Sequence, residues 1–138
     1  MKFTNRQFGE LEFDEKYVIE FQEGILGFEE YKRYLIVNDE DSEPFRWLVS
    51  LEDADLSFAM IDPALIIDSY RPGVVKDPNA TVFLLVALKQ PLEGSTTNLR
   101  SPIVIDNATQ KGRQLILDDE ALSVRHPLFS RQTELVEG

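Results

Sequence analysis

Short apolar runs, separated by residues that favour turns, recur along almost the whole chain. Roughly eight to nine of these runs have the length and the β-branched or aromatic character of strands. None continues with the spacing of a long amphipathic helix, in which apolar residues recur every three to four positions. Strands this short, joined by turns, pack as two layers or as a closed sheet. The sequence therefore predicts an all-β, antiparallel barrel or sandwich with at most short helical turns.

The length and composition fit one folding unit. The chain has 138 residues, of which 43% are hydrophobic. A chain of this size buries roughly two thirds of the surface that its unfolded form exposes, and no repeat or long linker divides it. We therefore expect a single domain over residues 1–138, with the last residues frayed.

Residues 98–117 contain the clearest hairpin signal. Two apolar runs, at residues 103–105 and 115–117, flank a polar connection that contains Gly112. Glycine can adopt the positive φ that a hairpin loop or bulge requires. Pro102 lacks a backbone donor, so we expect the first strand to begin directly after it.

Polar residues at the two ends of this hairpin are candidates for recognition. Asn98 can bond neighbouring backbone in a turn, which favours a structural role for its side chain. Arg100 is expected to pair with an acidic residue, because the chain carries so many of them. Lys111 and Arg113 lie at the loop end, where the guanidinium of Arg113 could reach a carboxylate or the carbonyl end of a partner helix.

Six other segments also have strand signatures, and one of them is the short run at residues 34–37. Residues 8–13 alternate apolar and polar side chains and precede the run 17–21, so these two are expected to form an opening hairpin. Residues 45–50 and 56–61 are joined by a short polar connection and are expected to pair antiparallel. Residues 81–88 form the most apolar run, which predicts a strand buried on both faces.

An apolar loop with two glycines follows the run 17–21. Gly24 and Gly27 flank Ile25 and Leu26, and Phe28 follows directly. Such a loop either closes the end of a barrel or presents an apolar contact to a partner. We expect Ile25 and Leu26 to be exposed at its tip, and Phe28 to point inward as a plug.

Negative charge is concentrated in the first half of the chain. The net charge is -11, and residues 1–69 hold seventeen acidic and six basic residues, against eight of each in residues 70–138. Such a field repels phosphate backbones and speeds encounter with basic proteins. An acidic surface that only maintains solubility is an alternative reading. Direct binding to nucleic acid is not expected.

Few residues could support catalysis or hold a cofactor. The chain has no cysteine and one histidine, His126, which we expect at the surface. Residues 39–43 are acidic but lack the glycine of a calcium loop. No phosphate-binding loop or nucleophile elbow is found, and no apolar run is long enough to span a bilayer. We expect a cytoplasmic protein that is not an enzyme and has no cofactor, metal site or membrane contact. The rival interpretation is a barrel that binds a small molecule, or a small enzyme, with a polar interior.

Six motifs occur in the order typical of one family. They are F-x-x-G-I-x-G-F-E at 21–29, P-F-x-x-L-x-S at 44–50, E-D-A-D-L-S-F-x-x-x-D-P at 52–63, N-L-R-S-P-I-V-I at 98–105, G-R-Q-L-I-L at 112–117 and V-R-H-P-L at 124–128. Together they resemble the flagellar assembly factor FliW family over nearly the whole chain. The chain departs from the family pattern at Leu26, where proline is usual, and between Tyr70 and Thr81, where it is shorter.

The resemblance implies a small β-barrel-like protein that binds newly made flagellin. In a second complex, which excludes the first, members of the family bind the carbon storage regulator CsrA and relieve its repression of flagellin synthesis. We expect the protein to be a monomer when free. The candidate partner-binding residues are Ile25, Leu26, Phe28, Asn98, Leu99, Arg100 and Arg113.

Overall fold

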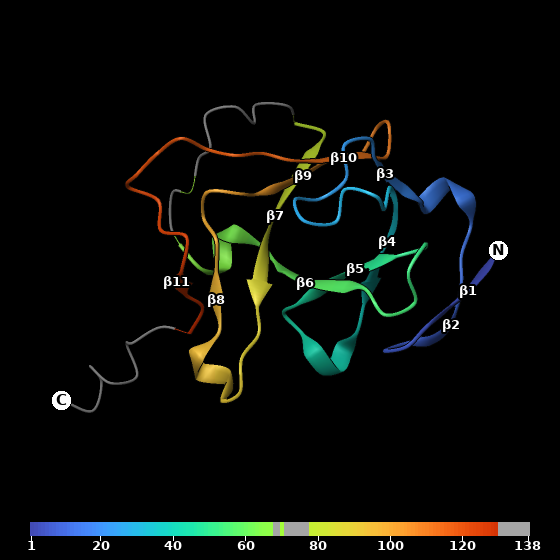
Figure 1. Cartoon of the computed structure of the whole chain (residues 1–138), viewed down its shortest axis with the longest axis horizontal. Coiled ribbons are helices and arrows are strands. Elements are labelled where there is room, and N and C mark those ends of the chain that lie inside the picture. The colour runs from blue at the N-terminus through green and yellow to red at the C-terminus, as the bar shows by residue number, and fades with distance from the viewer. Residues whose placement is uncertain (68–69, 71–77, 130–138) are drawn as a thin grey trace.

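The structure is a computed structural model that describes residues 1–67, 70 and 78–129 (Figure 1). No helix in these ranges is long and apolar enough to cross a bilayer. The helical turns are the 3₁₀ segments η1 (Glu15–Tyr17), η2 (Glu40–Ser42), η3 (Pro63–Leu65) and η4 (Leu92–Gly94). The strands are β1 (Lys2–Asn5), β2 (Gly9–Glu12), β3 (Ile19–Phe21), β4 (Arg33–Asn38), β5 (Arg46–Ser50), β6 (Ser57–Ile61), β7 (Ala80–Ala87), β8 (Thr96–Thr97), β9 (Ile103–Asp106), β10 (Lys111–Gln114) and β11 (His126–Pro127).

Seven strands close into a barrel. The order is β7, β6, β5, β4, β3, β10 and β9, and β9 returns to pair with β7. All of these pairs are antiparallel except β3 with β10, which run parallel. β8 and β11 extend the sheet outward from β7. The all-β class is thus confirmed as a barrel, and the sandwich is excluded.

Apolar side chains fill the barrel interior. Phe21 and Tyr34 are fully buried and meet edge to face, with ring centroids 5.2 Å apart. The hydroxyl of Tyr34 is buried, and this desolvation, with the charge of Glu52 as a smaller cause, raises the pKa of Tyr34 to about 12. The remaining members of this core are Ile19, Ile25, Leu48, Met60, Phe83, Ile103 and Ile105. A second apolar cluster, which includes Leu84, Leu99 and Leu128, packs outside the first.

The opening hairpin differs from the prediction. Residues 9–12 form β2, which pairs with β1 as a separate two-stranded sheet, and residues 19–21 enter the barrel as β3. The two runs are separated because Asp14 caps η1 by accepting from the backbone N–H of Lys16. The tip of the β1–β2 hairpin is held on the barrel by Arg6, whose backbone N–H donates to the carbonyl of Ala54.

The predicted pairing of β5 with β6 is confirmed. The prediction that residues 81–88 form a strand buried on both faces holds only for the middle of β7. In β7, Phe83 and Leu84 are buried, whereas the flanking residues are half-buried because the strand extends past the barrel. Residues 126–128 anchor the end of the described chain through β11 and buried Leu128. The expected fraying of residues 130–138 lies outside the described ranges.

The β9–β10 hairpin begins at Ile103, as predicted, but its second strand is β10 rather than residues 115–117. The positive φ lies at Gln110, with a value of 59°, and not at Gly112. Gly112 is a glycine for a different reason. A Cβ atom at this position would overlap the ring of Phe21, so glycine lets β10 lie directly against the barrel core.

Candidate partner-binding groove

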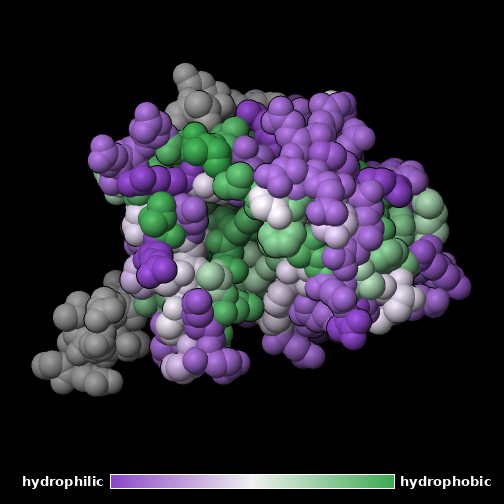
Figure 2. Space-filling view, in the orientation of Figure 1, coloured by the Kyte–Doolittle hydropathy of each residue, from purple (hydrophilic) through white to green (hydrophobic). Residues whose placement is uncertain are grey.

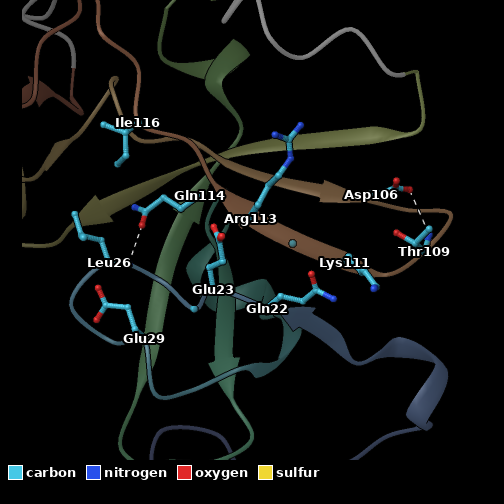
Figure 3. Close-up of a pocket in the computed structure, with 12 residues that line it drawn as sticks. Gln22, Glu23, Leu26, Glu29, Asp106, Thr109, Lys111, Arg113, Gln114 and Ile116 are labelled. Atoms are coloured by element: carbon cyan, nitrogen blue, oxygen red, sulfur yellow. Dashed lines mark hydrogen bonds between the residues drawn. The ribbon is translucent and has the colours of Figure 1, made fainter.

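A groove of about 470 Å³ lies between β10 and the loop that follows β3 (Figure 3). The loop contributes one wall and β10 with its extension contributes the other. We call this cavity the β10 groove. It is lined by Gln22, Glu23, Gly24, Leu26, Glu29, Asp106, Thr109, Lys111, Gly112, Arg113, Gln114 and Ile116.

Two glycines determine the shape of the loop wall. Gly24 and Gly27 have φ values of +71° and +90°, in the left-handed region where side chains are disfavoured. A Cβ atom on Gly24 would also collide with the backbone of Glu29. Between the glycines the chain makes a tight turn, in which the N–H of Phe28 donates to the carbonyl of Ile25 at 2.6 Å.

This turn directs Ile25 and Leu26 in opposite directions. Ile25 is 1% exposed and belongs to the barrel core, whereas Leu26 is 67% exposed. The prediction that both residues are exposed is therefore wrong for Ile25 and right for Leu26. Phe28 is 37% exposed and packs edge to face on Phe58, so it closes the barrel end only in part.

Polar contacts hold the exposed tip in place. The backbone N–H of Leu26 donates to Oε1 of Gln114 across the groove at 2.8 Å. The carboxylate of Glu29 accepts from the N–H of Gly27, and this contact lowers the pKa of Glu29. Leu26 is thus presented to solvent by backbone that is fixed on both sides.

The rim of the groove combines apolar and charged side chains. Ile116 is 66% exposed and lies at the same end of the groove as Leu26 and Gln114 (Figure 3). Arg113 and Lys111 are exposed on β10, and within the described ranges neither forms an ion pair. Glu23 lies close below Arg113 in the same view. An apolar surface with separate charges of both signs suits a protein segment.

The predicted residues at the base of the hairpin are structural. Oδ1 of Asn98 accepts from the N–H of Arg100 at 2.8 Å, which confirms the turn role of Asn98. Leu99 is 2% exposed in the second apolar cluster, so its side chain packs there and offers almost no surface to a partner. Arg100 was predicted to pair with an acidic residue, but among the residues that the structure describes it forms no ion pair. Its guanidinium donates to the carbonyls of Leu122 and Glu120 and so fixes the segment before β11.

Of the predicted contact residues, the structure thus brings Leu26 and Arg113 together in one groove. Glu23, Gln114 and Ile116 complete it, and the sequence did not single them out. Ile116 belongs to the apolar run 115–117, which predicts a hairpin strand, but in the structure it follows the end of β10 and is exposed. The pairing of Gln114 with Leu26 joins positions 88 residues apart, for which a single sequence carries no signal.

Negative charge is largely uncompensated elsewhere on the surface. Among the described acidic residues, only Asp55 and Glu15 form ion pairs, with Arg6 and Arg33. Figure 2 shows hydrophilic residues over much of the half of the molecule that contains β1 to β6. This half carries the acidic excess of the sequence.

Comparison with known proteins identifies the family. The profile of the FliW protein family matches residues 2–128. The flagellar assembly factor FliW of Lachnoclostridium phytofermentans is 35% identical over 144 residues, covering 95% of this chain and 92% of the relative. That of Caldicellulosiruptor bescii is 37% identical, covering 91% and 88%. A crystal structure of the flagellar assembly factor FliW superposes with a TM-score of 0.84 at 26% identity and covers 96% of this chain and 99% of that one. The matched length includes every barrel strand and both walls of the β10 groove, and the chain belongs to the FliW family.

Proposed function

We propose that this protein is a flagellar assembly factor that acts in the cytoplasm by binding proteins rather than by catalysis. It binds flagellin and, in a complex that excludes the first, the translational regulator CsrA, whose repression of flagellin synthesis it relieves. Its family membership supports the general role, as does the name shared by its relatives. The observation that carries the proposal is the β10 groove, an exposed and fixed surface of mixed apolar and charged character.

We assign flagellin to the β10 groove. Leu26 and Ile116 each expose about two thirds of their side chains, although the backbone of Leu26 is bonded to Gln114. Contacts on a fixed scaffold lose little conformational entropy on binding. Arg113 can add a charge-assisted hydrogen bond to a partner carboxylate. The proposal is tested by pull-down of the purified protein with flagellin and with CsrA, separately and in competition.

The first prediction concerns the rim of the groove. Leu26→Ser and Arg113→Ala should each weaken flagellin binding by about 1–3 kcal/mol, the range for loss of an interface anchor. Neither change should move the free energy of unfolding by more than about 0.5 kcal/mol, because both side chains are exposed. Titration calorimetry and thermal melts measure the two effects. Leu65→Ser is a matched control for Leu26→Ser, because Leu65 has a similar exposure of 60% but lies outside the groove. Unchanged flagellin affinity in both groove variants would refute this assignment.

We assign the basic regulator CsrA to the acidic half of the surface, and this leads to a second prediction. The association rate with CsrA should fall steeply as salt is added, because electrostatic steering fades when the Debye length shrinks to about 8 Å at physiological ionic strength. Association with flagellin should depend less on salt. Stopped-flow rates from low to high salt provide the measurement, and a flat profile for CsrA would contradict the assignment.

A further inference from the structure

The two sides of β10 are paired to different extents. Toward β9, the backbone pairing continues past the strand end, where the N–H of Leu115 donates to Pro102 at 2.9 Å and that of Leu117 to Arg100 at 2.7 Å. Toward β3, the pairing stops after Lys111 and Gly112. It stops because the chain after β3 turns away, with the N–H of Gly24 donating back to the carbonyl of Phe21.

This difference leaves a short open edge inside the groove. Successive residues of a strand direct their backbone groups to opposite sides. Since Leu115 and Leu117 bond toward β9, the N–H and C=O groups of Gln114 and Ile116 face the groove. Within the described ranges, no backbone hydrogen bond joins these two residues to the opposite wall. The wall is connected to the edge through the Gln114 side chain, which reaches the N–H of Leu26.

Side chains around the edge would define what can pair with it. Leu26 and Ile116 provide two exposed apolar surfaces, and Arg113 provides a cation that has no ion pair with another described residue. The charges at the rim also discourage indiscriminate pairing, as lysines and other charges do on natural edge strands. A strand that enters here gains backbone bonds from the edge and side-chain selectivity from the rim.

We propose that the β10 groove binds an extended segment of the flagellin chain by strand addition alongside β10. The backbone of the segment pairs with Gln114 and Ile116, one apolar side chain packs between Leu26 and Ile116, and an acidic side chain meets Arg113. Flagellin is chosen over the basic regulator because the acidic half of the surface suits the regulator, whereas the groove carries charges of both signs, Lys111 and Arg113 against Glu23, Glu29 and Asp106. The inference rests on the proposed function and specifies how the groove would hold its partner.

Proline substitution tests the backbone contacts. Gln114→Pro and Ile116→Pro each remove one N–H that faces the groove, and both leave the bonds to the β9 side intact. The matched controls Gln114→Ala and Ile116→Ala remove the same side chains but keep the N–H. With purified flagellin as the probe, each proline variant should bind about tenfold more weakly than its alanine control. Thermal melts establish that the variants are folded.

Amide hydrogen exchange on the unmodified protein provides a second test that needs no variant. The amides of Gln114 and Ile116 should exchange fast in the free protein and slowly in the flagellin complex. If they stay fast, and proline and alanine variants bind alike while Leu26→Ser weakens binding, strand addition is wrong and the groove assignment stands. If no groove variant affects flagellin, the assignment itself fails. Protection by CsrA but not by flagellin would overturn the choice of partner.

Discussion

Replacing Phe21 with alanine should lower the free energy of unfolding by about 3–5 kcal/mol, as expected for a large buried aromatic side chain. Phe21 is fully buried, meets Tyr34 edge to face, and occupies the space above Gly112. It also lies in β3, which joins its two neighbours through short pairings. Loss of this ring therefore affects both the core and the parallel seam that closes the barrel. Chemical denaturation gives the magnitude.

The contact with Gly112 allows a sharper version of the same experiment. Gly112→Ala should cost about 1–3 kcal/mol on its own, because the added methyl group meets the Phe21 ring. In the Phe21→Ala background the methyl group has room, so the same change should cost much less. A double-mutant cycle would then show a favourable coupling between the two substitutions. Strictly additive effects would show that the ring does not restrict position 112.

Ile25→Ala should lower the free energy of unfolding by about 2–5 kcal/mol, whereas Leu26→Ala should change it by less than about 0.5 kcal/mol. The two residues are neighbours in sequence, but Ile25 is 1% exposed and Leu26 is 67% exposed. The effects on flagellin binding should be the opposite of the effects on stability. Leu26→Ala should weaken binding in proportion to the apolar contact that it removes. Urea denaturation of each variant provides the comparison.

The matched pair makes this result easy to interpret. Both substitutions leave the backbone of the turn between Gly24 and Gly27 unchanged, including the bond from the N–H of Leu26 to Gln114. A difference in stability therefore reports the direction of the side chains. Equal and large losses of stability would mean that the tip of the loop is part of the barrel closure. In that case the apolar contact for flagellin would have to lie elsewhere.

Local patterns were sufficient for the fold class and for two pairings between neighbours in the chain, β9 with β10 and β5 with β6, but not for the opening hairpin. The start of the hairpin at Ile103 follows from Pro102, which has no N–H to donate, and the pairing of β5 with β6 follows from a short polar connection between two alternating runs. Both signals act over a few residues. The family resemblance likewise depends on motifs that can be read directly from the sequence, and it is confirmed.

Long-range packing determined the features that local patterns misplaced. Gly112 reads as a loop residue because glycine favours turns, yet it lies in β10, where the ring of a residue 91 positions earlier leaves no room for a side chain. Leu99 and Arg100 belong to the motif at 98–105 and were candidate contact residues through the family resemblance. In the structure, the first fills an apolar cluster and the second bonds two carbonyls of a distant segment.

By itself, the sequence determined that the chain forms short antiparallel strands, where several of them turn, and to which family it belongs. The tertiary structure alone decided that β3 meets β10 in parallel and that β9 returns to β7 to close the barrel. It also decided that Ile25 points inward while Leu26 points out, and that the edge of β10 stays open beside Arg113. The physical reason is the range of the interactions. Side-chain alternation and turn preference act between near neighbours, whereas closure and exposure depend on which distant segments share one core.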